Sequence, residues 1–226
     1  MTSRVLVVPD LQVPFQSKYA LTFLKRVRDQ YKTDTVICVG DEADACALSK
    51  YPKDPDGMSA GDELRKTRRA LKPFYEAFPD VRVCNSNHQQ RLYKRAFEAG
   101  IPRELIVGYG QYLSAPKGWR WADAWNVEGI RFEHGDRASG ALTGPKLIDA
   151  NHRSTIYGHH HSTAGLGYVR KGNMTLFWMN VGCLIDENAY AMSYTKMSRT
   201  KPVLSCGVVI DGIPQLVPMI RDGRTR

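Results

Sequence analysis

Short apolar runs rich in strand-forming residues recur along the whole chain, and they constrain its fold more than any other feature. The runs cover residues 5–8, 35–39, 81–84, 130–133, 154–157, 176–181 and 206–210. The first two are apolar almost throughout, which is typical of strands buried on both faces of a sheet that is covered by helices. The sequence therefore predicts a core of buried strands.

Two segments between these runs have helical periodicity. In the first, apolar residues follow the three-to-four spacing of one helix face from Ala20 to Tyr31, and Ser17 is the predicted N-cap. The second runs from about Ala60 to Phe78 with an apolar stripe on one face. Its other face is cationic and carries Arg65, Lys66, Arg68, Arg69 and Lys72. Alternating strands and helices, followed by a mostly β last third, predict a layered α/β architecture.

The length and composition favour a single domain. The chain has 226 residues, of which 42% are hydrophobic, and this is enough to bury one large core. We interpret 1–226 as one domain with loop insertions near 50–61, rich in Pro, Asp and Gly, and near 100–126, where aromatic residues alternate with Gly and Pro. The basic end, 221–226, is expected to be frayed.

Charge and targeting signals bear on partners and location. The net charge is +9, from 32 basic and 23 acidic residues, which favours nucleic acid or phosphorylated ligands, with solubility alone as the alternative.

The 5 cysteines form no C-x-x-C pair, and we expect reduced, structural thiols. Neither a signal peptide nor an apolar run of roughly 18 residues is found. We therefore expect no membrane partner and a cytoplasmic location, which would be the host cytoplasm for a viral protein.

Polar residues capable of binding a metal follow the predicted strands, where the sites of α/β sheets are built. They stand in these segments: Pro9-Asp10-Leu11-Gln12, Gly40-Asp41-Glu42-Ala43-Asp44, Asn85-Ser86-Asn87-His88, Glu133-His134-Gly135 and Gly158-His159-His160-His161. Taken singly, each has an ordinary explanation as a turn or cap. Taken together they do not, because turns have no use for so much histidine. Mixed Asp, Asn and His donors suit Mn²⁺, Fe or Zn²⁺, and two such ions roughly 3.5 to 4 Å apart can hold a phosphate for in-line attack.

The order of these residues resembles the calcineurin-like metallophosphoesterase superfamily. The pattern of that family is D-x-H, G-D-x-x-D, G-N-H-D/E, H and G-H-x-H, and the similarity here spans Asp10 to His161. The resemblance implies two mixed β-sheets packed as a sandwich and flanked by helices in four layers. It also implies a cofactor of two divalent metal ions, for which we expect Mn²⁺, with Fe, Zn²⁺ and Ni²⁺ as alternatives.

The resemblance further implies a role for each residue. Asp10, Gln12 and His161 would bind the first metal, Asn87, His134 and His159 the second, and Asp41 both. His88 would be catalytic, stabilising charge on the phosphate and protonating the leaving oxygen, which requires an imidazole pKa near the operating pH. Asp44 would orient a ligand or His88. We interpret His160 as a packing residue, with substrate contact as the alternative.

The sequence departs from the family pattern in two of its motifs. Gln12 replaces a histidine, and its carboxamide oxygen is the weaker donor, so the first metal site is expected to be loose, Mn²⁺-selective or filled only with substrate. Ser86 and Gln89 replace the glycine and the acidic residue around Asn87 and His88, which removes a hydrogen-bond partner for His88. Because the other ligands are present, a weakened site is favoured over a dead one.

The substrate is predicted from charge and aromatic content. Asp44 is followed by Ala45-Cys46 and not by the arginine that protein phosphatases carry there, which argues against that branch. The cationic helix face and the aromatic residues from Tyr109 to Trp125 resemble a groove for single-stranded nucleic acid, although a satellite core explains the aromatic residues equally well. We therefore predict a phosphodiesterase or nuclease acting on DNA or RNA. The alternatives are a phosphatase or cyclic-nucleotide phosphodiesterase for small nucleotides, and a catalytically silent nucleic-acid-binding protein.

Overall fold

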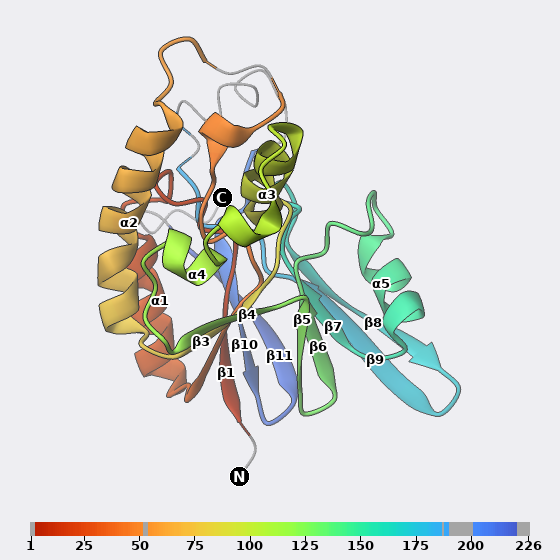
Figure 1. Ribbon diagram of the computed structural model, residues 1–226. Helices are drawn as coiled ribbons and strands as arrows, with labels where there is room; N and C mark the ends of the chain where they lie inside the picture. The colour runs from red at the N-terminus through yellow and green to blue at the C-terminus, as the bar shows by residue number, and fades with distance from the viewer. Residues whose placement is uncertain (1–2, 52–53, 187, 190–200, 221–226) are drawn as a thin grey trace.

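The structure is a computed structural model that describes residues 3–51, 54–186, 188–189 and 201–220 (Figure 1). Its first sheet has 6 strands in the order β11-β10-β1-β2-β3-β4. Their bounds are β1 Arg4–Val8, β2 Thr35–Cys38, β3 Val81–Cys84, β4 Trp119–Ala122, β10 Ser205–Ile210 and β11 Ile213–Pro218. Strands β1 to β4 are parallel, whereas β10 and β11 are antiparallel to their neighbours. The sheet is therefore mixed.

The second sheet is also mixed and has 5 strands in the order β5-β6-β7-β9-β8. Their bounds are β5 Ala124–Val127, β6 Ile130–Glu133, β7 Thr155–Tyr157, β8 Gly165–Lys171 and β9 Met174–Asn180. Strands β6, β7 and β9 are parallel, and β5 and β8 pair antiparallel at the edges. Each sheet thus contains a set of neighbouring parallel strands that run in the same direction.

Helices flank the two sheets. The described residues form α1 Ala20–Tyr31, α2 Ala60–Ala77, α3 Gln89–Glu98, α4 Tyr109–Tyr112 and α5 Thr143–Asn151, with short 3-10 turns at Cys46–Leu48 and Arg103–Leu105. In Figure 1, α1 and α2 cover the first sheet on the left, and α5 covers the second sheet on the right. The layers are helix, sheet, sheet and helix, and this arrangement confirms the predicted fold class.

Two apolar clusters hold the layers together. The larger one joins α1 and α2 to the first sheet through residues such as Leu24 and Leu71, both fully buried. The second lies between the sheets, where Val7 and Ile37 of the first sheet pack with Phe132 of the second. Strands β1 and β2 contribute to both clusters, which explains their nearly continuous apolar sequence.

The expected elements mostly agree with the structure. Each of the apolar runs forms a strand, and the two periodic segments form α1 and α2. The predicted N-cap is wrong, because Tyr19 occupies that position and makes no side-chain capping bond. Ser17 lies two residues earlier, and its main-chain oxygen accepts from Ala20 N at 2.9 Å. The thiols of Cys38, Cys84, Cys183 and Cys206 are buried, as expected for structural cysteines.

The two predicted insertions differ. In 50–61, the described residues before Ala60 form no helix or strand, and residues 52 and 53 lie outside the described part. The segment 100–126 is not a loop throughout, because it contains α4, strand β4 and most of β5. Strand β4 pairs with β3 along its length, which gives this aromatic segment regular hydrogen-bond partners. The basic end, 221–226, lies outside the described residues.

No helix in the described residues is long and apolar enough to cross a membrane.

Candidate metal centre

The carboxyl ends of the parallel strands of both sheets meet at the upper edge of the sandwich in Figure 1. The segments that leave these ends carry all of the residues predicted for the site. They are Asp10 and Gln12 after β1, Asp41 and Asp44 after β2, Asn87 and His88 after β3, His134 after β6, and His159 and His161 after β7. Residues from both sheets therefore reach one place, although Asp10 and His161 are 151 positions apart in the sequence.

Asp41 lies at the centre of this cluster and is 1% exposed. Its Oδ2 accepts a hydrogen bond from Gln12 Nε2 at 2.9 Å and lies 3.5 Å from His134 Nε2 and 3.6 Å from His88 Nε2. Burial raises the pKa of Asp41, but the neighbouring imidazoles of His134 and His88 oppose burial, and the net pKa is well below its ordinary value. Asp41 is therefore an ionised carboxylate held among nitrogen atoms.

The donor atoms form two groups that share Asp41. One consists of Asp41, His134 and His159, and the other of Asp10, Asp41 and His161. Within each group the ligand atoms lie within 4.8 Å of one another. One carboxylate common to two groups of donors could contact two neighbouring cations.

The backbone of Gly158 and His159 lies close to the carboxylate of Asp10. Asp10 Oδ2 is 2.8 Å from His161 Nε2 and accepts from the main-chain N–H of His159 at 3.0 Å. Burial lowers the pKa of His161, but the contact with Asp10 reverses this, and the net pKa is raised. A Cβ at Gly158 would lie 2.2 Å from Asp10 Oδ1, so only glycine lets the strand end approach this carboxylate.

In the other donor group, the ring of His134 lies close to atoms of Asn87 and His159 that can accept hydrogen bonds. His134 Nδ1 lies 3.0 Å from the carbonyl oxygen of Val39, which favours the proton on Nδ1 and leaves the lone pair on Nε2. That Nε2 atom is 2.7 Å from Asn87 Oδ1 and 3.2 Å from His159 Nδ1. Two acceptors at 2.7 Å need a proton or a cation between them. Burial lowers the pKa of His134, but the Asp41 and Asp10 carboxylates outweigh it, and the net pKa is raised.

The donor set fits divalent cations. Asp10 Oδ1 and Gln12 Oε1 are buried and have no hydrogen-bond partner within the described part of the chain. Burying such atoms unpaired costs free energy that a cation would offset. Carboxylate and amide oxygens with imidazole nitrogens are ligands for Mn²⁺, Fe, Zn²⁺ or Ni²⁺.

The backbone of several candidate ligands is strained. Gln12, Asp41 and His159 have φ angles of 53°, 49° and 67°, in the left-handed region that residues with a side chain rarely adopt. Such conformations cost of order 1–3 kcal/mol each and cluster at functional sites. Strain at three of the candidate ligands supports a functional origin for the cluster.

His88 and Asp44 meet a third residue, Arg91, which the sequence reasoning missed. Arg91 Nη1 donates to the main-chain oxygen and to Oδ1 of Asp44 at 2.9 and 3.1 Å, and its Nη2 lies 2.7 Å from His88 Nε2. His88 Nδ1 lies 3.8 Å from Asp44 Oδ1. The signal was the spacing, since residues 88 and 91 lie one turn apart at the start of α3.

The titration of His88 and Asp44 differs from the expectation. Burial lowers the pKa of His88 to about 4, with Asp41 opposing and Arg91 assisting the shift. Burial also raises the pKa of Asp44 to about 7, against the effect of Arg91. A neutral His88 that accepts from Arg91 is not the imidazole with a pKa near the operating pH that the predicted role requires. The permanent positive charge beside it belongs to Arg91.

The aromatic residues of 100–126 do not form exposed stacking platforms. Tyr109 and Trp119 are each 6% exposed and belong to the larger core cluster, against which Tyr112 and Trp121 also pack. Trp121 Nε1 donates to Glu42 Oε1 at 2.9 Å, and Trp125 packs against the other cluster. The two interpretations of these residues, a stacking groove for nucleic acid and a satellite core, are therefore both wrong, since the rings pack in or against the two main clusters.

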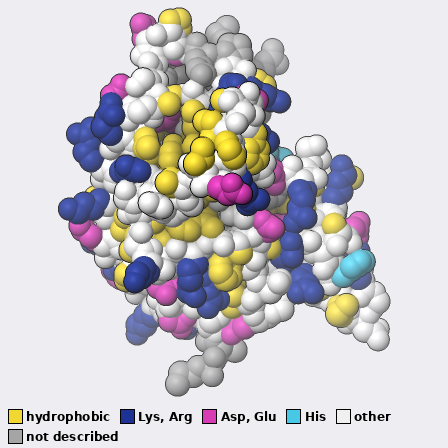
Figure 2. Space-filling model, in the orientation of Figure 1, with side chains coloured by type: hydrophobic (Ala, Val, Ile, Leu, Met, Phe, Trp, Pro, Cys, Tyr) yellow, Lys and Arg dark blue, Asp and Glu magenta, His cyan; other side chains and the backbone are white. Residues whose placement is uncertain are grey.

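The cationic face of α2 is confirmed. Arg65, Lys66, Arg69 and Lys72 are exposed, and Figure 2 shows basic side chains along the left flank, where α2 lies in Figure 1. Arg68 is half-buried and donates from Nε to the main-chain oxygen of Tyr112 at 2.8 Å.

Comparison with solved structures gives weak similarities. The chain is similar to vacuolar protein sorting 29 from Cryptosporidium parvum, with 11% identity, a TM-score of 0.44, and 95% of each chain covered. It is also similar to Vps29 of Chaetomium thermophilum, with 13% identity, a TM-score of 0.44, and coverage of 95% and 86%. The third is YfcE, a phosphoesterase from E. coli, with 15% identity, a TM-score of 0.45, and coverage of 93% and 90%. None of these similarities is close enough to assign an activity.

No family model and no curated protein matches the sequence.

Proposed function

We propose that this protein is a metal-dependent phosphoesterase that hydrolyses phosphodiesters of nucleic acids or nucleotides. The observation that carries the proposal is the position of Asp41, which belongs to two groups of acidic and imidazole donors at once. The ligand order resembles that of the metallophosphoesterases, and the candidate donors follow strands of both sheets.

In the proposed assignment, Asp10, Gln12 and His161 hold one cation, Asn87, His134 and His159 hold the other, and Asp41 contacts both. When bound, the two cations would neutralise charge on the phosphate and lower the pKa of a water molecule toward 7. We propose Mn²⁺ because Gln12 offers an oxygen where a nitrogen donor would favour later metals.

The residues around the cations have supporting roles in this proposal. The Val39 carbonyl orients His134 by accepting from its Nδ1–H, so that Nε2 faces the centre. Arg91 places a positive charge 2.7 Å from His88, and Asp44 holds that guanidinium in place. His88, whose side chain is 13% exposed, would contact the phosphate, with Arg91 supplying the charge that a neutral imidazole lacks.

A nucleic-acid strand is the proposed substrate on the grounds of charge. The net charge of +9 and the exposed basic residues of α2 attract a polyanion. Because Trp119 is buried and Trp121 and Trp125 pack against the cores, these rings do not add the support that base stacking would have given. A nucleic-acid-binding protein without catalysis is the alternative from a different class.

The test is hydrolysis of labelled oligonucleotides and of bis-p-nitrophenyl phosphate with Mn²⁺ present. We expect cleavage of both by the wild type and of neither by Asp41→Asn, which should still bind oligonucleotide. Cleavage of the small diester alone would contradict the polymer substrate. Oligonucleotide binding with no turnover in either protein would support the silent alternative.

A further inference from the structure

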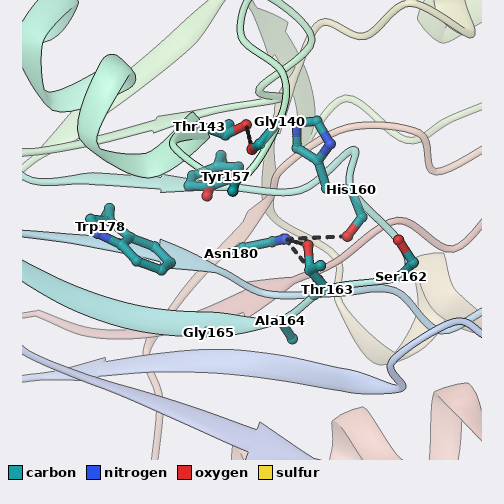
Figure 3. A pocket seen from close by; sticks show the side chains of 11 residues that line it. Gly140, Thr143, Tyr157, His160, Ser162, Thr163, Ala164, Gly165, Trp178 and Asn180 are labelled. Carbon is teal, nitrogen blue, oxygen red and sulfur yellow. Dashed lines mark hydrogen bonds between the residues drawn. The ribbon is translucent and has the colours of Figure 1, made fainter. Parts of the chain in front are cut away.

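A cavity of about 550 Å³ opens beside the metal centre, on the α5 side of the second sheet (Figure 3). Tyr157, His160, Trp178 and Asn180 form its larger walls, and Gly165 with other small residues leaves the remaining space open. Its volume is within the range of roughly 300–1,000 Å³ that is typical of small-molecule sites.

The cavity and the metal centre share one loop. His160, which lines the cavity, stands between the candidate ligands His159 and His161, and the ring centroids of His159 and His160 are 5.0 Å apart. Asn180 holds this loop by donating from Nδ2 to the main-chain oxygens of His160 and Thr163, at 3.2 and 2.7 Å. A group bound in the cavity therefore lies one side chain away from the centre.

The lining is uncharged and rich in rings. No Lys, Arg, Asp or Glu is among the described residues that form it, so the cavity offers no charged side chain of those types to a phosphate. The Trp178 indole is fixed, since a Cβ at Gly144 or Gly167 would approach it to 2.3 or 2.6 Å. Rigid apolar edges of this kind favour a flat, uncharged ligand.

One polar group on a mostly buried side chain points into the space. Tyr157 is 3% exposed, and Figure 3 shows its hydroxyl directed between Trp178 and Asn180. Within the described residues this hydroxyl has no hydrogen-bond partner, whereas Tyr75 Oη donates to Leu113 O at 3.2 Å. A tyrosine hydroxyl is a hydrogen-bond donor at neutral pH. A ligand with a ring acceptor would satisfy it.

We propose that this cavity binds the base of a nucleotide whose phosphate lies at the metal centre, with Tyr157 donating a hydrogen bond to the base. The inference rests on the proposed phosphoesterase function and names the substrate group that the site selects. His160 would then contact substrate, which is the alternative role considered for it.

The test compares two substrates that differ only in the base: thymidine 5′-(p-nitrophenyl phosphate) and the corresponding ester of 1,2-dideoxyribose. With Mn²⁺ present, we expect kcat/KM of the wild type to be at least about fivefold higher for the thymidine ester. Tyr157→Phe removes the hydroxyl alone and should lower this ratio about 3- to 5-fold, toward 1, as expected for one neutral hydrogen bond.

A second variant blocks the cavity without touching Tyr157. A Cβ at Gly165 would lie 3.5 Å from Trp178 Cζ3, an ordinary contact, so Gly165→Leu can fill the space. We expect the ratio to fall to about 1 in this variant. Tyr168→Phe is the matched control for Tyr157→Phe, because Tyr168 is 60% exposed and does not line the cavity. An equal loss in this control, or a wild-type ratio near 1, would overturn the proposal.

Calorimetric binding separates this proposal from the proposed function. In Mn²⁺ buffer, the wild type should bind thymidine 5′-monophosphate more tightly than 2-deoxyribose 5-phosphate, and Gly165→Leu should bind both equally. If neither ester is hydrolysed but this preference holds, the phosphoesterase function fails and the base site stands. If both esters are hydrolysed at the same rate and both phosphates bind equally, the base site fails and the function stands.

Discussion

At the scale of single residues, the contact between His88 and Arg91 determines what the centre can do beyond binding cations. Arg91 Nη2 lies 2.7 Å from His88 Nε2, and the Arg91 guanidinium is anchored on Asp44. The guanidinium keeps its charge throughout the physiological pH range. The pair therefore presents a fixed positive charge and an imidazole to the same side of Asp41.

Replacing His88 by Asn tests this assignment. We expect turnover of bis-p-nitrophenyl phosphate to fall by roughly 10- to 100-fold, because a hydrogen bond to a charged group contributes about 1.5–3 kcal/mol, while the number of bound Mn²⁺ ions is unchanged. Steady-state kinetics and metal analysis measure the two effects. The control is His152→Asn, because His152 is exposed and has a φ of 53°, which Asn tolerates. Loss of metal from His88→Asn would show that His88 is a ligand instead.

The residues of the centre were predictable from sequence because each directly follows a run of strand-forming residues. Arg91 was only partly predictable, since its spacing from His88 is visible in the sequence but nothing local indicates that its side chain reaches Asp44. The pKa of His88 was not predictable, because its lowering depends on burial by segments far away in the chain.

At the scale of elements, the turn between α2 and β3 supports strand β4. The Val81 N–H donates to the Gly118 carbonyl at 3.1 Å, and a Cβ at Gly118 would lie 2.1 Å from the Pro79 carbonyl oxygen. We predict that Gly118→Ala lowers the free energy of unfolding by about 2 kcal/mol or more, since backbone must move to admit the methyl group.

Urea denaturation measures this loss, with Gly108→Ala as the control. A Cβ at Gly108 meets nothing within 4 Å, and its φ is −58°, so we expect a change within about 0.5 kcal/mol. Equal effects of the two substitutions would be incompatible with the close packing of β4 against this turn.

Elements with a clear local pattern were predicted, and those that depend on distant partners were not. β1 and β2 are apolar because both faces of the sheet are covered. β4 and β5 are separated by Asp123 alone yet join different sheets, and Asn85 Nδ2 donates to Asp123 Oδ1 at 2.8 Å where the chain crosses between them. The strands β4 and β5 are short, and their mixed aromatic and polar sequence has no clear strand pattern. Pairing with distant strands therefore decides their structure.

At the scale of the whole molecule, the contact between the sheets aligns the two halves of the centre. Phe132 is fully buried in the cluster between the sheets, two residues before His134. We predict that Phe132→Ala lowers the free energy of unfolding by about 3–5 kcal/mol, the cost of a large core cavity. Phe97→Ala, at a side chain 53% exposed, should change it much less. A small effect at Phe132, measured by urea denaturation, would contradict the role of this interface.

The account as a whole depends on two cations held on either side of Asp41, and calorimetric titration of the chelator-treated protein with Mn²⁺ tests this most directly. We predict that the wild type binds two Mn²⁺ ions per chain and that Asp41→Asn, which keeps the shape of the side chain, loses at least one of them. Absence of Mn²⁺ binding by the wild type, or the same stoichiometry and affinity in both proteins, would contradict the account.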